Sequence, residues 1–138
     1  RYSRGLHRQV ESVLGGSDAP VVRIRRFFDY LVDGARRDEE SRGCLLVNTL
    51  LEAPADEPEL RRRAGEALQY VEQRLESLVA DGQRDGSIQR TQSPDELARA
   101  LMAVIFGMRV YSRMPDGLEH IEEIATTLLE NTLSPRAS

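Results

Sequence analysis

Tryptophan is absent from this sequence of 138 residues, and aromatic residues make up only 5% of it. A folded core therefore has to be built mostly from leucine, valine, isoleucine and alanine. The single cysteine excludes an intramolecular disulfide and suits a reducing compartment. The longest apolar run, which starts at Ala100, is far shorter than the roughly 20 residues that span a bilayer, and no signal-peptide pattern opens the chain. We expect a cytoplasmic domain with no membrane partner.

Charge and histidine content argue against further classes of function. The net charge of −4 argues against a surface that binds a phosphate backbone by itself. His7 and His120 are expected on different helices, with no cysteine or second histidine at ligand spacing, so we expect no metal site. No glycine-rich phosphate loop follows a strand, and we expect no cofactor. A Cys–His or Ser–His–Asp nucleophile stays open on sequence alone. Both histidines are nevertheless expected to be solvated, so we do not expect an enzyme.

Helical periodicity runs through nearly the whole chain. Apolar residues recur at steps of three and four, which predicts an all-α bundle of about six helices in one domain, residues 1–138. A first short helix should end at the glycine pair that begins at Gly15. Ser17 or Asp18 should then cap the second helix, with Pro20 in its first turn.

Two further helix starts carry capping patterns. Asp56, with Glu59 three residues later, forms a capping-box-like start for a long helix that should end at Gly86. The sequence "SPDE", which begins at Ser93, combines a serine cap, proline in the first position and acids in the first turn. This is the clearest helix start in the chain, and the helix that follows should reach about residue 113.

The helix from residue 93 to residue 113 is apolar on two sides, which indicates that it is either central in the bundle or packs on two partners at once. Glycine at position 107, inside this helix, lowers helix stability by roughly 1 kcal/mol relative to alanine. Close approach of another helix would explain the glycine, and a neutral glycine near a helix end explains it equally well. We expect this helix and the last one to form a four-helix bundle with a second copy of the chain. The positions expected in this homodimer interface are Leu101, Val104, Ile105, Gly107, Met108, Tyr111, Ile121, Ile124 and Leu128.

The segment "GCLLVNTLLE", residues 43–52, is predicted to be a short helix that places polar side chains in an apolar run. Packing as a small buried hydrophobe explains Cys44 better than a redox-sensing thiol does. Asn48 and Thr49 either satisfy neighbouring backbone groups or line an apolar cavity in which a few polar groups orient a ligand. The residues alone leave both interpretations open.

Taken in order, the block "GCLLVN", the helix exit "DGQRDGSI" and the helix start "SPDELA" resemble the C-terminal regulatory domain of TetR/AcrR-family transcriptional regulators. The resemblance extends from the first helix to about Leu133. It implies that the last two helices form the dimer and that the central helices surround a cavity for a small, moderately apolar effector. It also implies an N-terminal helix-turn-helix domain for operator DNA, which would precede Arg1 and is absent from this chain. The opening "RYSRGLHRQV" is accordingly expected to come from inside a longer protein.

The resemblance places effector contacts at inward positions of the central helices. These positions are Phe27, Phe28, Leu31, Cys44, Val47, Asn48, Leu51, Tyr70, Arg74, Met102 and Phe106. Core packing is the alternative for each apolar member. Tyr70 and Arg74 lie one turn apart and can present a hydroxyl and a cation together, although Arg74 can equally pair with Glu72 or Glu76. We expect a ligand-responsive transcriptional repressor; the alternative is a stand-alone helical interaction module without a small-molecule ligand.

Overall fold

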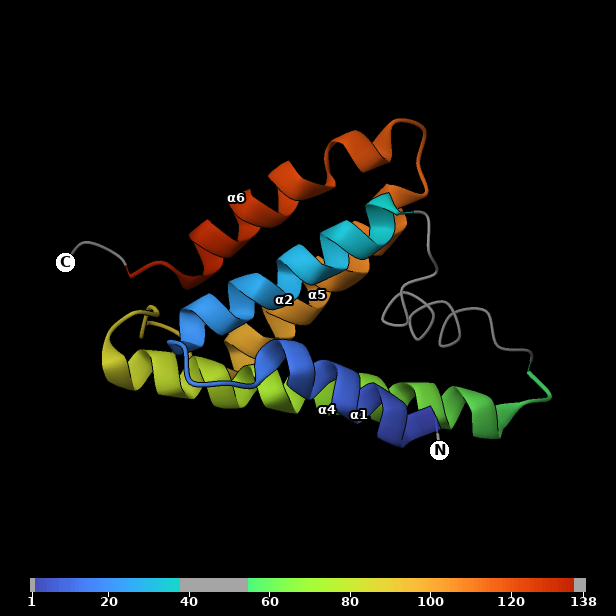
Figure 1. Ribbon diagram of the computed structural model, residues 1–138, viewed down its shortest axis with the longest axis horizontal. Helices are drawn as coiled ribbons and strands as arrows, with labels where there is room; N and C mark the ends of the chain where they lie inside the picture. The colour runs from blue at the N-terminus through green and yellow to red at the C-terminus, as the bar shows by residue number, and fades with distance from the viewer. Residues whose placement is uncertain (1, 38–54, 136–138) are drawn as a thin grey trace.

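Five α-helices and one short 3-10 helix make up the part of the chain that the computed structural model describes, residues 2–37 and 55–135. In chain order they are α1 (Tyr2–Leu14), α2 (Pro20–Arg36), α4 (Pro58–Asp85), α5 (Pro94–Ser112), the 3-10 helix η1 (Gly117–Glu119) and α6 (Ile121–Leu133) (Figure 1). No strand occurs within these ranges, so the all-α prediction is confirmed. The short helix predicted over residues 43–52 lies outside them.

The central helix of this arrangement is α2. It contacts α1, α4, α5 and α6, and in Figure 1 it lies with α5 between α6 on one side and the α1–α4 layer on the other. Its core side chains are accordingly closed to solvent, with Ile24 and Phe28 no more than 1% exposed. The helix predicted to be apolar on two sides, α5, packs on α4, α6 and α2. None of the described helices is long and apolar enough to cross a bilayer.

Three helix ends follow the sequence signals. At the start of α5, the backbone N–H of Glu96 donates to Ser93 Oγ at 3.4 Å, and the backbone N–H of Ser93 donates to Glu96 Oε1 at 3.0 Å. Gly86 ends α4 with φ of 86°, and Gly16 follows α1 with φ of 107°. Only glycine adopts this left-handed backbone without a steric cost, so the predicted stops at these glycines are confirmed.

The predicted cap of α2 is wrong. Ala19 occupies the N-cap position, Pro20 is the first helical residue, and no side chain caps the helix. The N-cap position thus falls on a residue whose side chain has no hydrogen-bond acceptor. Asp18 instead forms an ion pair with Arg26, and Ser17 lies too far before the helix to serve.

The capping box predicted from Asp56 and Glu59 is also wrong. The first helical residue of α4 is Pro58, and the residue before it makes no capping hydrogen bond through its side chain. The carboxylate of Glu59 turns forward along the helix and binds Arg62 and Arg63. Two guanidinium groups therefore outcompete the backbone for this carboxylate.

Gln89, which is only 3% exposed, connects the loop between α4 and α5 to the end of α6 by hydrogen bonds. Its backbone N–H donates to the carbonyl of Leu133 at 2.9 Å, and its side-chain Nε2 donates to the carbonyl of Thr132 at 2.9 Å and to Gln92 Oε1 at 3.0 Å. The backbone N–H of Thr91 donates to Gln89 Oε1 at 3.2 Å, and the Thr91 hydroxyl donates to the same oxygen. One buried amide thus joins two segments more than 40 residues apart.

Candidate functional site

Three side chains, hereafter the Glu11 cluster (Glu11, Tyr70 and Arg74), join α1 to α4. The Tyr70 hydroxyl donates to Glu11 Oε2 at 2.7 Å. Arg74 donates through Nε to Glu11 Oε2 at 2.5 Å and through Nη2 to Glu11 Oε1 at 3.0 Å. Tyr70 and Arg74 do present a hydroxyl and a cation to one acceptor, and that acceptor belongs to α1 rather than to Glu72 or Glu76.

The electrostatics of the Glu11 cluster keep its carboxylate ionised. Hydrogen bonding from Arg74 lowers the pKa of Glu11 below its ordinary value of 4.5, burial opposes this, and the Tyr70 hydroxyl assists it. Burial raises the pKa of Tyr70 above its ordinary 10.0, and its hydrogen bond to Glu11 adds to the rise. The hydrogen bond to Glu11 raises the pKa of Arg74 as well. The cluster is therefore a charged Glu–Arg pair with a neutral tyrosine over a broad pH range.

A cleft of about 220 Å³ lies beside the cluster, between α1 and α4. We call it the α1–α4 cleft; it is lined by His7, Arg63, Glu66, Ala67, Gln69, Tyr70 and Gln73. The ring of His7 stacks on the ring of Tyr70, with centroids 3.9 Å apart and planes inclined at 25°. Tyr70 therefore belongs both to the cluster and to the cleft wall.

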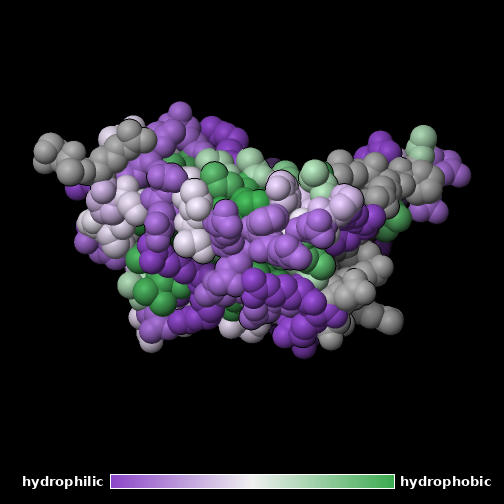
Figure 2. All heavy atoms as spheres, turned by 90° about the horizontal axis from the view of Figure 1, so that it is seen from above, coloured by the Kyte–Doolittle hydropathy of each residue, from purple (hydrophilic) through white to green (hydrophobic). Residues whose placement is uncertain are grey.

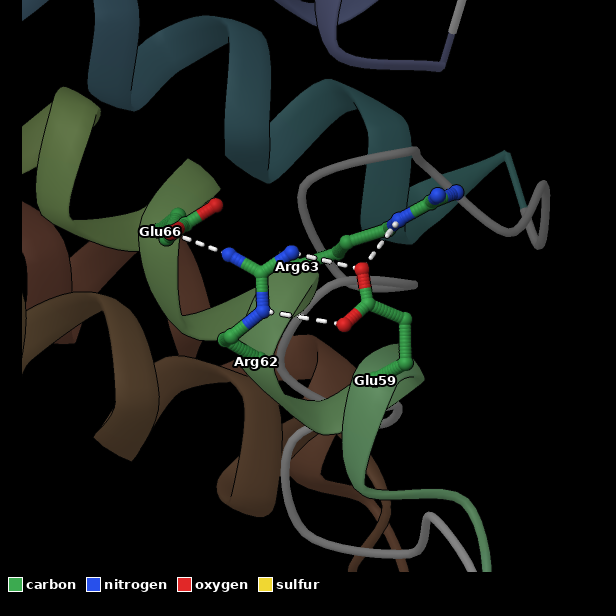
Figure 3. Close-up of polar contacts among 4 residues, drawn as sticks. All are labelled: Glu59, Arg62, Arg63 and Glu66. Carbon is green, nitrogen blue, oxygen red and sulfur yellow. Dashed lines mark hydrogen bonds and ion pairs between the residues drawn. The ribbon is translucent and has the colours of Figure 1, made fainter.

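Figure 3 shows the ion pairs on the first turns of α4, at the rim of this cleft. Arg62 donates to Glu59 Oε1 at 2.5 Å and to Glu59 Oε2 at 3.0 Å, and its Nη1 donates to Glu66 Oε2 at 2.6 Å. Arg63 donates to Glu59 Oε1 at 3.2 Å. Hydrogen bonding from Arg62 lowers the pKa of Glu59 to about 2. All four side chains are more than half exposed, so these ion pairs stabilise the fold little. Arg63 and residues 56–60 line a second, more open cleft of about 440 Å³.

The predicted effector contacts fall into three groups. Phe27, Phe28, Leu31 and Met102 are buried, and Phe106 is half-buried, in the packing of α2 and α5. Tyr70 and Arg74 belong to the Glu11 cluster. The remaining positions lie outside the described residues; they are Cys44, Val47, Asn48 and Leu51. The effector site as a whole therefore stays a prediction, and only Tyr70 among its members lines the α1–α4 cleft.

The predicted dimer positions divide between the interior and the surface of the chain. Inside the chain, where they pack its own core, are Leu101, Val104, Ile105, Met108 and Ile121. Gly107, Tyr111 and Leu128 are exposed and Ile124 is half-buried. Val110 and Met114 were not among the predicted dimer positions. They are the most exposed large apolar residues of α5 and the turn after it, at 58% and 50%. Spacing offered a signal, because positions 103, 106, 107, 110 and 114 repeat at helical steps.

We define the α5–α6 face as eight of the exposed or half-buried residues of these two helices and the turn after α5. They are Ala103, Phe106, Gly107, Val110, Tyr111, Met114, Ile124 and Leu128. Figure 2, which views the molecule from the α6 side, shows apolar residues reaching the surface in patches bounded by polar ones. Scattered apolar residues are normal on a surface, but a stripe along one helix indicates a contact surface.

No group of three or more histidine, cysteine or acidic side chains suited to a metal ion occurs within residues 2–37 and 55–135. The two histidines of the sequence are both exposed: His7 stacks on Tyr70, and His120 lies edge-on to Tyr111. His120 Nδ1 also lies 3.9 Å from Glu123 Oε2, so the described contacts of the two histidines are with aromatic rings and one surface carboxylate.

Stability should depend on pH through the Glu11 cluster. Because the folded pKa of Glu11 lies below 4.5, its contribution is complete above that pH and is lost as pH falls through the lowered value. Since the folded pKa of Tyr70 lies above 10.0, its contribution is lost as pH rises through the raised value. We expect Glu11→Gln to cost about 1 kcal/mol of unfolding free energy at neutral pH, a low figure because the carboxylate is partly exposed, and less below pH 4.5.

Urea denaturation at a series of pH values measures this difference. The matched control is Glu130→Gln, an exposed glutamate on α6, which should change the unfolding free energy little at any pH. A Glu11→Gln penalty that stayed constant down to pH 3 would contradict the assignment of the ionised carboxylate.

Comparisons with known proteins bear on the fold and on the family. The family model described as "Tetracyclin repressor-like, C-terminal domain" matches residues 20–128. The solved structure of a TetR transcriptional regulator from Chloroflexus aurantiacus J-10-FL has a similar fold, with a TM-score of 0.75 and 23% sequence identity. The similarity covers 93% of this chain and 65% of that one. Among curated proteins no sequence matches this chain. Because the family model extends from α2 into α6, the chain belongs to the tetracyclin repressor-like C-terminal domain family.

Proposed function

We propose that this chain is the effector-binding and dimerisation domain of a ligand-responsive transcriptional repressor that works in the cytoplasm. The observation that carries the proposal is the exposed apolar stripe of the α5–α6 face in a member of this family. Operator binding would belong to an N-terminal helix-turn-helix domain outside these 138 residues. The proposed role requires neither a cofactor nor an enzymatic step.

A second copy of the chain is the proposed partner of the α5–α6 face. Burial of apolar surface contributes roughly 25 cal/mol per Å², so covering Val110 and Met114 favours association. A Cβ at Gly107 would meet no atom within 4 Å, so another helix has room to approach the backbone of α5 there. This supports the close-approach interpretation of Gly107. A dimer of this kind would hold two helix-turn-helix domains at the spacing of two operator half-sites.

The proposed effector is a small, moderately apolar molecule held by the central helices. Tyr70 and Arg74 from α4 supply its polar contacts, and Phe27, Phe28 and Met102, which pack in the core of α2 and α5, remain its predicted apolar contacts. A few convergent polar groups among apolar side chains are typical of small-molecule sites. The effector can act only if it binds one arrangement of the domain better than another, with a coupling of about 1–3 kcal/mol.

The proposal is tested by fusing residues 1–138 behind a helix-turn-helix domain that cannot dimerise by itself. Repression of a reporter from a palindromic operator should require the fused chain, and a panel of small acids, amines and neutral apolar compounds should contain one that relieves repression. Repression that no compound relieves would favour the stand-alone dimerisation module. A fusion that neither represses nor sediments as a dimer would overturn the proposal.

A further inference from the structure

We infer that Tyr70, Arg74 and the adjoining α1–α4 cleft form a binding site for a small monocarboxylate, and that Glu11 occupies this site when no ligand is bound. The inference rests on the proposed function, because it assigns the effector to a chemical class. It also specifies how binding reaches α1, since the group that the ligand displaces belongs to that helix.

The donors are arranged as a carboxylate-binding site. Arg74 uses Nε and Nη2 on the two oxygens of one carboxylate, at 2.5 Å and 3.0 Å, and the Tyr70 hydroxyl adds a third hydrogen bond at 2.7 Å. Paired N–H groups of arginine match both oxygens of a carboxylate, which gives this contact strength and direction. The Glu11 carboxylate therefore shows where the carboxylate of a ligand would lie.

The α1–α4 cleft supplies room for the rest of such a ligand. Its volume of about 220 Å³ is below the roughly 300–1,000 Å³ of pockets for drug-sized molecules, so the ligand is small. Stacked His7 and Tyr70 provide an aromatic wall, and Ala67 lines the cleft with an apolar side chain. Of the charged side chains at the rim, Arg63 pairs with Glu59 and Glu66 pairs with Arg62, so the rim adds no net charge and the anion preference comes from Arg74.

Glu11 is well placed to exchange with a ligand. Its side chain is 41% exposed, so water reaches the carboxylate as it leaves. Arg23 of α2 lies close enough to help lower the pKa of Glu11, and a displaced carboxylate therefore keeps a cationic neighbour. The Glu11 cluster supplies the polar bonds described between α1 and α4, with the His7–Tyr70 stack beside it. Exchange would consequently loosen α1 from α4 and leave its contacts with α2.

The test is calorimetric titration of the 138-residue chain with benzoate and with its neutral isostere benzamide. We expect benzoate to bind and benzamide not to bind. Because each variant removes a hydrogen bond to a charged group, Tyr70→Phe and Arg74→Gln should each weaken benzoate binding by about tenfold or more. Glu11→Gln removes the internal competitor and should tighten benzoate binding several-fold. A purely structural role for Glu11 predicts no such gain.

A second variant and a second measurement guard against misfolding. Glu11→Asp keeps the charge but shortens the reach to Arg74, so it should also tighten benzoate binding; circular dichroism checks that each variant is folded. Hydrogen exchange of α1 amides should rise with benzoate in the wild-type chain. Weaker binding in both Glu11 variants, or no benzoate binding at all, overturns the inference. If benzoate does not bind but another compound relieves repression by the fusion protein, the inference is wrong and the proposed function stands. If the chain is also a monomer, both are wrong.

Discussion

Val110→Asp should leave the chain monomeric at the micromolar concentrations at which we expect the wild-type chain to be a dimer. Val110 is 58% exposed on the α5–α6 face, so an aspartate there leaves the core of the single chain intact. In a dimer of the proposed kind the new carboxylate would be buried in the interface, and an unpaired charge taken from water costs several kcal/mol. Sedimentation equilibrium measures the change, which should exceed about a hundredfold in the dimer dissociation constant.

Leu60→Asp is the matched control for this prediction. Leu60 is also an exposed aliphatic residue. Its exposed fraction is 44%, and it lies near the start of α4, away from the α5–α6 face. Its replacement should leave both the oligomeric state and the thermal midpoint nearly unchanged. If Val110→Asp remained dimeric, or if both variants became monomeric, the α5–α6 face would lose its assigned role.

Gln89→Ala should lower the unfolding free energy by about 3 kcal/mol. Truncation removes the amide that serves the carbonyl of Thr132, both donors of Thr91 and the side chain of Gln92. Each hydrogen bond of this buried amide contributes about 0.5–1.5 kcal/mol, and the freed groups of Thr91 and Gln92 are exposed and can bond to water. Urea unfolding followed by circular dichroism measures the loss.

Arg90→Ala, at the exposed neighbouring position, should change the unfolding free energy by less than about 0.5 kcal/mol. It tests whether the effect comes from the amide rather than from any change in the connection between α4 and α5. A Gln89→Ala variant as stable as Arg90→Ala would show that water replaces the amide without cost.

The helix starts show which features of the fold can be predicted from the sequence. The capping box at Ser93 is a local pattern whose two hydrogen bonds involve residues three apart, so sequence alone predicts it. The caps expected from Asp18 and Asp56 failed for another reason. Their helices begin one or more residues later than the predicted caps require, with Ala19 and Glu57 at the N-cap positions, and arginines bind Asp18 and Glu59. The identity of those arginine partners depends on side-chain geometry, which a spacing rule does not contain.

The candidate sites show the same division between local and distant information. Tyr70 and Arg74 were expected to act together because they lie one turn apart, and they do. Glu11 was missed because it lies 59 and 63 positions away, and only the packing of α1 on α4 brings it near. Apolar composition likewise pointed to α5 and α6 as dimer helices. It did not predict which side each helix turns inward, so the expected interface includes Leu101, which is buried in the single chain, and omits Val110, which is exposed.

The contacts of α1 with α4 also restrict the direction in which α1 can move. His7 meets Tyr70 and Glu11 meets Arg74, so equal steps of four residues match along two helices that run the same way (Figure 1). A slide by one turn, about 5.4 Å, in one direction would bring the Glu11 carboxylate level with Leu78, which is only 1% exposed. A slide of one turn the other way would bring Glu11 level with Tyr70 and leave Arg74 without its acceptor. The contacts between α1 and α4 thus permit a single register. We therefore expect α1 to respond to ligand binding by tilting against α4 rather than by sliding along it.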